Sequence, residues 1–581
     1  MNLEKLWYKK LPKSYPKSLK YYEGNIADFL AGSAKKYPDR IVIYFLGRKF
    51  TYAEIDDLVN RFATSLHNLG VKKGDVVAIF LANCPQFMIT YYAALRIGAI
   101  VTFCSPLHSE PEIARHLIDT GAETIITLKL KFFYDKINNI REQTKLKRII
   151  ISDFRNYVST KIKILFTIFR FRLLAKVKKA DYIYSFKELL KTPPNPPKVI
   201  IDPKKDIAVL ALTGGTTGTP KCAIISNYNV VVNVTQLAAS MSPALGEKIK
   251  PEYIPKTFPS EPLRNVQVVI PWFHTMGNNG YMNLMVFWAM SIVLLPRFDP
   301  LDYMKIMRKY LPTIIAGAPQ LFIPILNHPK LDKFKKDFAQ IKIIGSGAAP
   351  LPVEHLKNLR ELVNPGGGII IEGYGLTEVT AGAIIGPGLL TLERKAGSVG
   401  FPLIDTDVKI VNDDGEEVEV GQEGEIIIKG PQVMLGYWKD PKATAEIIKD
   451  GWLYSGDIGY MDEEGYFFIV DRKKDMLKYK GYQYSSRELE EVLLKYPDIE
   501  QAAVVGVKTE MGEIPRAYIV LKENANVKPD DSGAKAIKEF VHSQVALYKK
   551  IKELIFRDEL PVTMTGKVLK RELRSEIEEE S

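Results

Sequence analysis

Cysteine is scarce in this chain: 581 residues contain three, at Cys84, Cys104 and Cys222. Three widely spaced thiols give neither the even number of a disulfide framework nor the spacing of a metal-ligand set. This pattern is typical of proteins kept in a reducing compartment, so we expect a cytoplasmic location.

Long apolar runs are also missing. The longest, 284–296, is too short to cross a bilayer as a helix, and it fits either a buried core or the lining of a wide channel. Residues 1–20 mix lysine, tyrosine and proline and lack the apolar core of a signal peptide. A chain of 581 residues is too long for one hydrophobic core, so two or more domains are expected.

Acidic residues are the minority among the charges. The 80 lysines and arginines outnumber 68 aspartates and glutamates, which gives a net charge of +12. Such an excess favours anionic partners: nucleotides, coenzyme phosphates, a lipid surface or nucleic acid. No nucleic-acid recognition motif is present, so nucleic acid is not expected among the partners. The oligomeric state stays open, a homodimer included.

Strand-like and helix-like segments alternate through the first two thirds of the chain. A helix is predicted from about 50 to 69 and a buried strand at 74–81, with further strands at 266–270, 314–316 and 341–344. This alternation predicts α/β architecture with doubly wound parallel sheets. We expect two such sheets and a β-rich subdomain within 1–471, then a small mobile α+β domain at 472–581.

The segment 161–179, KIKILFTIFRFRLLAKVKK, interrupts this alternation. It is aromatic, apolar and basic, and it contains no acidic residue. Its cations fall on two sides of a helical wheel, so it is not a regular amphipathic helix. Two interpretations stay open: peripheral contact with anionic lipid at the inner face of the membrane, or a basic helix that covers the domain.

A glycine- and threonine-rich loop follows an apolar run at 207–211 that predicts a buried strand. Glycines let the backbone fold closely around an anion, while hydroxyl and amide groups donate hydrogen bonds. The loop therefore suits a polyphosphate, although its spacing is not that of a Walker A motif and an ordinary turn has the same composition. Its residues are Thr213, Gly214, Gly215, Thr216, Thr217, Gly218 and Lys221.

A second candidate segment ends a predicted strand at 371–378. The backbone of Gly373 would let a nucleobase approach, and Tyr374 could stack on it. Thr377 could bond a phosphate, and Glu378 could hold Mg²⁺, which prefers few carboxylates together with phosphate oxygens. A strand followed by a helix cap would explain Thr377 and Glu378 equally well.

Three more segments add to the pattern. Asp457 follows Gly456, and its carboxylate could accept hydrogen bonds from both hydroxyls of a ribose. An ordinary turn aspartate, which accepts hydrogen bonds from the backbone, is the alternative interpretation. The charged run 470–475 fits a solvated loop, and Lys567 fits an exposed tail. Each segment is a weak signal alone, but their order along the chain is informative.

Taken together, these motifs resemble those of the adenylate-forming superfamily, which contains acyl-CoA synthetases, luciferase and peptide-synthetase adenylation domains. The resemblance covers nearly the whole chain, and several stretches are most similar to long-chain fatty acid–CoA ligases. The ordered motifs are 213–221, 271–274, 373–378, 455–457, 471–481 and 566–567, with 430–438 and 556–561 as supporting stretches.

The resemblance implies ATP, Mg²⁺ and coenzyme A as co-substrates or cofactors, with a role for each motif. The glycine-rich loop would bind the β- and γ-phosphates. Lys567 would be the catalytic lysine of acyl-adenylate formation, and His274 would contact the carboxylate. The adenine would lie against Ala349, Gly373 and Tyr374, the ribose would be held by Asp457 and Arg472, and phosphate and Mg²⁺ would be handled by Thr377, Glu378 and Thr216.

The resemblance also implies a hinge at Lys474. Rotation there would remove Lys567 and bring in the face of Lys478 and Gly481 for thioester formation.

Four positions, in three segments, depart from the family pattern. Cys222 puts the shape of the loop in question, Ser455 keeps the expected hydroxyl, and Tyr484 and Ser486 are expected to alter the second-step surface.

The expected function is a ligase that activates a medium- or long-chain fatty acid to acyl-AMP and transfers the acyl group to CoA. Two alternatives stay open within the enzyme class: a CoA ligase for a short-chain or aromatic acid, and an acyl-AMP ligase that delivers to a carrier protein. A non-catalytic binding protein is disfavoured, because Lys567, Glu378, Asp457 and Arg472 are all retained.

Overall fold

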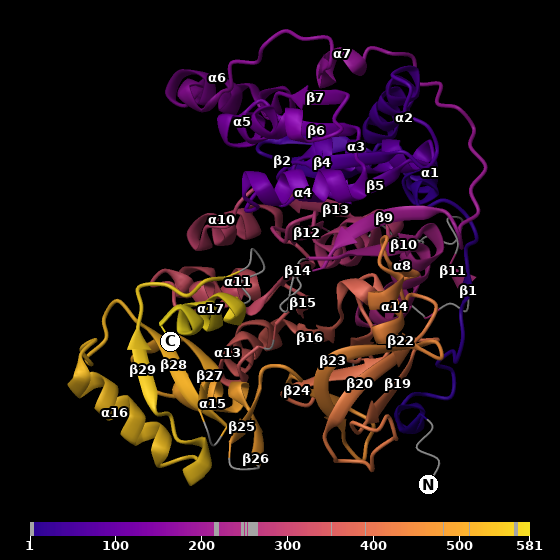
Figure 1. The fold of residues 1–581 in the computed structure, drawn as a ribbon. Helices are drawn as coiled ribbons and strands as arrows, with labels where there is room; N and C mark the ends of the chain where they lie inside the picture. Colours follow the sequence, from indigo (N-terminus) through magenta and orange to yellow (C-terminus); the bar gives the residue numbers. More distant parts are fainter. Residues whose placement is uncertain are drawn as a thin grey trace.

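The computed structural model describes residues 5–213, 220–245, 249, 252–253, 265–349, 351–389, 391–479, 482–509, 512–562 and 568–580. The chain is an α/β protein with a large N-terminal region and a small C-terminal domain, as the sequence predicts (Figure 1). No helix within these described ranges is long and apolar enough to span a membrane.

The first sheet is mostly parallel and lies with α3 (Pro85–Arg96), α4 (Glu110–Thr120) and α5 (Lys131–Ile140). Its central strands are buried along their whole length, as expected for a sheet covered on both faces. Its order is β21 (Gly436–Tyr437), β10 (Cys222–Ser226), β9 (Ile207–Leu212), β5 (Ile100–Phe103), β4 (Val76–Phe80), β6 (Thr124–Leu128), β7 (Arg148–Ser152) and β8 (Ile183–Ser185).

The second sheet begins as a parallel sheet and continues without interruption into the β-rich part. The parallel strands are β2 (Ile41–Phe45), β13 (Ser291–Leu294), β12 (Asn265–Val268), β14 (Ile314–Gly317), β15 (Ile343–Ser346) and β16 (Ile369–Tyr374). The antiparallel continuation comprises β17 (Ile384–Ile385), β18 (Ser398–Pro402), β24 (Phe467–Arg472), β23 (Trp452–Met461), β20 (Gly424–Lys429) and β19 (Asp407–Val411), while β3 (Arg48–Thr51) forms the opposite edge.

One hydrophobic core joins these two sheets through α3, α8 (Asn227–Met241) and α9 (Leu284–Phe287). The apolar run 284–296 belongs to this packing, and its residues are buried through Leu295. The predicted helix at 50–69 is α2 (Tyr52–Asn68), whose N-terminus is capped because the Thr51 hydroxyl accepts a hydrogen bond from the Glu54 amide. Other helices described in this region are α1 (Ala27–Lys36), α6 (Thr160–Phe169), α7 (Phe186–Leu189), α10 (Pro300–Tyr310), α11 (Pro319–Leu326), α12 (Lys335–Phe338), α13 (Val353–Val363) and α14 (Pro441–Ile447).

The C-terminal domain has its own sheet and its own apolar clusters. The sheet contains β26 (Tyr482–Ser485), β25 (Met476–Tyr479), β28 (Gly512–Leu521), β27 (Ile499–Thr509) and β29 (Glu553–Phe556), and its helices are α15 (Ser486–Leu493), α16 (Asp531–His542) and α17 (Lys570–Glu580). In Figure 1 this domain lies at the lower left, at the far end of the molecule from α6 (Thr160–Phe169).

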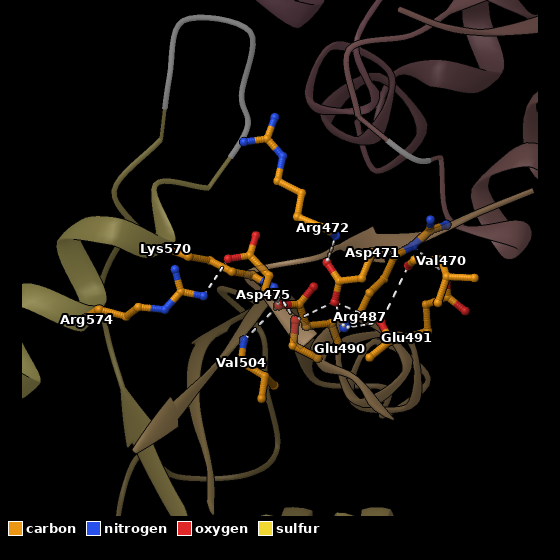
Figure 2. A network of polar contacts seen from close by, with 12 residues as sticks. Val470, Asp471, Arg472, Asp475, Arg487, Glu490, Glu491, Val504, Lys570 and Arg574 are labelled. Atoms are coloured by element: carbon orange, nitrogen blue, oxygen red, sulfur yellow. Dashed lines mark hydrogen bonds and ion pairs between the residues drawn. The ribbon is translucent and has the colours of Figure 1, made fainter. Parts of the chain in front are cut away.

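Asp471 links β24 of the large region to the start of α15 (Figure 2). Its backbone lies opposite Ile458 in the β23–β24 ladder. Its Oδ2 atom accepts hydrogen bonds from the hydroxyls of Ser485 (2.9 Å) and Ser486 (2.7 Å) and from the amide of Arg487 (3.2 Å). One carboxylate thus caps a helix of the small domain from a strand of the large region.

Lys570, the first residue of α17, is buried beneath this cap. Its ammonium group lies 2.7 Å from Glu490 Oε1 and donates to the Ser486 hydroxyl at 2.7 Å. Burial opposes the charge, but the carboxylates of Glu490 and Asp471 raise the pKa of Lys570. The same network contains an ion pair between Arg574 and Asp475 (Figure 2). Buried charges therefore hold α15, α17 and the end of β24 together.

Replacing Lys570 with Met leaves Glu490 buried without its cation. We expect the free energy of opening α15 and α17 to fall by about 3 kcal/mol or more, because breaking a buried pair exposes an uncompensated charge. Hydrogen exchange of the backbone amides of both helices in the full chain measures this loss.

The matched control is Lys535→Met on α16, since Lys535 is exposed and lies 3.9 Å from Glu539. Exposed pairs contribute about 0–1 kcal/mol, so exchange should barely change. Adding Glu490→Gln to Lys570→Met should recover part of the loss. Equal protection in the wild type and Lys570→Met would contradict the assignment.

Candidate active site

The carboxyl end of β16 meets β23 and β24, and three of the predicted residues lie together there. Tyr374 donates a hydrogen bond of 2.6 Å to Asp457 Oδ2. Asp457 and Arg472 are direct partners in the β23–β24 ladder, with Arg472 Nε 3.6 Å from Asp457 Oδ1. Burial and the neighbouring carboxylate of Asp457 raise the pKa of Tyr374 well above its ordinary value, so the phenol remains a donor.

The turn before Asp457 sets the direction of its carboxylate. Gly456 has a φ of 71°, a left-handed conformation that favours glycine. The Ser455 hydroxyl donates to the carbonyl of Ile426 (2.6 Å) and accepts from the amide of Asp457 (3.1 Å). Serine therefore supplies the hydroxyl that this turn needs, as the sequence predicts.

Glu378 lies in a short helical turn, Thr377–Val379, after β16. Its carboxylate accepts a hydrogen bond of 2.7 Å from the Tyr437 hydroxyl, and burial raises its pKa. The Tyr437 ring in turn lies 5.2 Å from the Lys221 ammonium group. Tyr437 thus lies between the residue that ends the glycine-rich loop and the candidate metal ligand. Tyr437 belongs to the motif 430–438, but no role was predicted for it from the sequence.

Thr213 and Lys221 close the base of the glycine-rich loop, because the amide of Thr213 donates to the carbonyl of Lys221 at 2.8 Å. Lys221 also lies 3.8 Å from the carboxylate of Asp440. The predicted phosphate-binding residues Gly214, Gly215, Thr216, Thr217 and Gly218 lie outside the described residues.

Cys222, directly after Lys221, points into the first domain. Its Sγ atom lies 3.7 Å from His116 Nδ1, and burial raises the pKa of the thiol to about 12. The Cys222 side chain is therefore packed between β10 and α4.

The loop after β15 approaches β16 closely. A Cβ atom at Gly347 would lie 3.3 Å from the carbonyl oxygen of Gly373 and 3.2 Å from the methyl group of Met276. Ala349, two residues further, is partly buried beside this wall. The predicted adenine-facing backbone thus comes from two neighbouring strand ends.

His274 begins the segment that contains Met276. Its Nδ1 atom accepts a hydrogen bond of 3.3 Å from the Met276 amide. A π-helix, Met276–Asn283, follows, a rare geometry that often marks functional sites. Its buried polar residues include Asn279, which donates to Asn233 at 3.1 Å, a network that the sequence did not indicate.

The predicted hinge residue Lys474 is partly buried next to Arg472. Burial and the charge of Arg472 lower the pKa of Lys474 to about 8. Lys478 is exposed on β25, while Gly481 and the catalytic candidate Lys567 lie outside the described residues. The two departures in this domain face inward: Tyr484 packs at 5.7 Å from the ring of Tyr548, and Ser486 belongs to the Asp471 cap.

The chain matches the AMP-binding enzyme family over residues 30–438 and the AMP-binding enzyme C-terminal domain over residues 488–567. It is 36% identical over 581 residues to a long-chain-fatty-acid–CoA ligase of Bacillus subtilis, with 99% of each chain covered. It is 32% identical to the probable 4-coumarate–CoA ligase 1 of Dictyostelium discoideum, with 92% of each covered.

The crystal structure of the anthranilate–CoA ligase AuaEII in complex with anthranoyl-AMP has a similar fold. It superimposes with a TM-score of 0.81 at 23% identity, covering 98% of this chain and 99% of that one. The fold and the family matches agree on one class: this chain belongs to the AMP-binding enzyme family. Within that family it is an acid–thiol ligase.

Replacing Tyr374 with Phe removes the donor that orients the Asp457 carboxylate. We expect AMP affinity to fall about fivefold to tenfold, because one hydrogen bond to a charged group contributes about 1–1.5 kcal/mol. Isothermal titration calorimetry with AMP measures the change.

The matched control is Tyr460→Phe on β23, the strand of Asp457, where the Tyr460 ring stacks on Phe468 at 4.8 Å. Its affinity for AMP should equal that of the wild type. Unchanged binding by Tyr374→Phe would show that this hydroxyl does not position the nucleotide.

Proposed function

We propose that this chain is a fatty acid–CoA ligase that acts on a medium- or long-chain fatty acid. The observation that carries this proposal is the meeting of Tyr374, Asp457, Arg472 and Glu378 around the end of β16. The similarity over full length to a ligase named for long-chain fatty acids supports the choice of substrate.

The proposed reaction has two halves. A carboxylate oxygen of the acid attacks the α-phosphorus of ATP, and pyrophosphate leaves. The thiol of coenzyme A then attacks the acyl carbonyl, and AMP leaves. Because the first half brings two anions together, cationic groups must stabilise the charge that builds up at the α-phosphate. Lys567 is our candidate for this role, and the loop 213–221 is the candidate for the β- and γ-phosphates.

Asp457 and Arg472 are the proposed ribose-binding residues. The carboxylate of Asp457 is mostly buried, with 14% of its side chain exposed, and one oxygen already accepts from Tyr374. Its second oxygen and the Arg472 guanidinium supply an acceptor and a donor at the same place. A 1,2-diol presents both kinds of group, so the pair suits a ribose.

Glu378 is the proposed Mg²⁺ ligand, with Thr216 as its predicted companion in the loop. Within the described ranges no group of three metal-binding side chains occurs, so an all-protein metal cage is not formed there. A single buried carboxylate near Lys221 fits Mg²⁺, which binds through few carboxylates together with substrate phosphates. When bound, the ion would neutralise phosphate charge.

Two other substrates define the alternatives. The relative named for 4-coumarate and the neighbour named for anthranilate favour testing aromatic acids. An acyl-AMP ligase that delivers to a carrier protein would use the same nucleotide residues. Lys474 would act as the hinge in either case, since rotation of the small domain lets one nucleotide site serve both adenylation and acyl transfer.

The substrate test measures CoA-dependent AMP formation with ATP and Mg²⁺. Saturated fatty acids from acetate to palmitate are compared with benzoate and 4-coumarate. We expect the largest kcat/KM with long chains, because added methylenes bury more apolar surface in the acyl site. An optimum at an aromatic or short acid would reject the fatty-acid assignment, and pyrophosphate exchange without CoA transfer would indicate a carrier protein as acceptor.

A pH titration tests the role of Glu378. Burial raises the pKa of Glu378, so protons compete with Mg²⁺ at a higher pH than for an ordinary glutamate. Lowering the pH towards that raised pKa should weaken the stimulation of ATP binding by Mg²⁺ in the wild type. Glu378→Gln should lose most of this stimulation at every pH.

The titration of Glu372 must be distinguished from that of Glu378, because burial raises the pKa of Glu372 to about 7. Glu378→Gln keeps Glu372, so any pH dependence left in that variant belongs to other groups. Glu417→Gln, which alters a surface carboxylate 3.0 Å from Lys409, is the matched control. Normal Mg²⁺ stimulation in Glu378→Gln would exclude Glu378 as the ligand.

A further inference from the structure

The segment from α6 to residue 179 exposes apolar side chains that the rest of the molecule does not cover. α6 contains no buried residue, although it is mostly apolar. Six large apolar side chains in a row of ten residues are between 45% and 73% exposed: Ile164, Leu165, Ile168, Phe169, Phe171 and Leu173. Single exposed apolar residues are ordinary on a protein surface, but a contiguous cluster marks a binding surface.

Specific contacts hold this segment in place. The ring of Phe166 packs edge-on against Phe154 at a centroid distance of 4.6 Å. Arg155 donates a hydrogen bond of 3.0 Å to the Thr167 hydroxyl, and Leu174 forms a β-bridge with Leu130. One side of α6 is thus attached to the domain while the opposite side presents the apolar cluster to solvent.

The charges around the cluster are all positive. Residues 154–180 contain no aspartate or glutamate. Apart from Arg155, which pairs with Asp153, the cations are exposed: Lys161, Lys163, Arg170, Arg172, Lys176, Lys178 and Lys179. No ion pair within the described ranges joins any of them to a carboxylate, whereas several surface lysines elsewhere are paired, for example Lys147 with Glu123 at 2.6 Å. An apolar centre with a cationic border is complementary to an anionic lipid surface.

The position of the segment suits attachment to a flat surface. In Figure 1, α6 lies at the upper left edge, whereas α16 and the rest of the C-terminal domain lie at the lower left. A membrane bound there would leave the C-terminal domain free to rotate.

We propose that residues 160–179 form an interfacial anchor that binds anionic phospholipid bilayers, with the apolar cluster inserted among the headgroups. The sequence left open whether this segment covers the domain instead. The exposure of α6 argues against that role, because a covering helix buries its apolar side chains. This inference deepens the proposed function, because fatty acids partition into bilayers and a docked ligase would receive its substrate from the same surface.

Co-sedimentation of the full chain with vesicles tests the anchor without any substrate. We expect binding to vesicles that contain phosphatidylglycerol, weaker binding to pure phosphatidylcholine, and a decrease as salt screens the cations. The variant Phe169→Ser/Phe171→Ser should lower the partition coefficient at least tenfold. The variant Arg170→Gln/Arg172→Gln should reduce binding to the anionic vesicles and leave binding to phosphatidylcholine unchanged.

The control Ile200→Ser/Leu547→Ser removes two apolar side chains that are 90% and 78% exposed elsewhere on the surface. It should bind vesicles as the wild type does. Equal binding by Phe169→Ser/Phe171→Ser, or no binding by the wild type, would overturn the proposal. Capture of a protein partner by this surface, with no vesicle binding, would also overturn it.

Ligase assays with acids kept in detergent separate this proposal from the proposed function. The anchor variants should retain wild-type activity there, because their side chains lie outside the nucleotide site. A chain that binds vesicles but activates no fatty acid would refute the substrate assignment alone. Loss of detergent-based activity in Phe169→Ser/Phe171→Ser would assign the cluster to the catalytic fold and overturn the anchor.

Discussion

The antiparallel pairing of β23 with β24 is the constraint on which the rest of the site depends. It places Asp457 opposite Arg472 and, one residue away, Ile458 opposite Asp471. The first pair forms the candidate ribose site, and the second directs the Asp471 carboxylate to the start of α15. A shift of β24 by one residue against β23 would turn the side chains of Asp471 and Arg472 to the opposite faces of the sheet. The candidate ribose site and the attachment of the small domain therefore share one ladder.

Burial gives the charged groups of this region their distinct properties. The carboxyls of Glu378 and Glu372 have raised pKa values because burial penalises their ionised forms. Asp471, also buried, has a lowered pKa because the charge of Lys570 and hydrogen bonds from Ser486 and its neighbours outweigh the effect of burial. One type of side chain is thus proposed as a cation ligand in one place and forms a helix cap in another.

The molecule separates its surface functions from this site. The exposed apolar and basic segment lies between β7 and β8 of the first sheet, whereas the domain junction follows β24 of the second. The proposed attachment at α6 and the proposed rotation at Lys474 can therefore operate independently, since no described contact links the two segments. With both in place, a surface-bound enzyme would be able to change the orientation of its small domain.

The sequence by itself determined the α/β class and the order of the elements, and it predicted the residues of the candidate nucleotide site, because apolar periodicity and glycine spacing are local properties. The helix at 52–68 and the strands near 266, 314 and 343 needed no tertiary information. Tertiary structure alone decided that Tyr437 bonds Glu378, 59 residues away, and that Lys570 pairs with Glu490. Such partners are brought together by sheet order and helix packing, which local sequence does not encode. The same holds for segment 160–179: its composition was plain, but only the packing of α6 decided which side faces solvent.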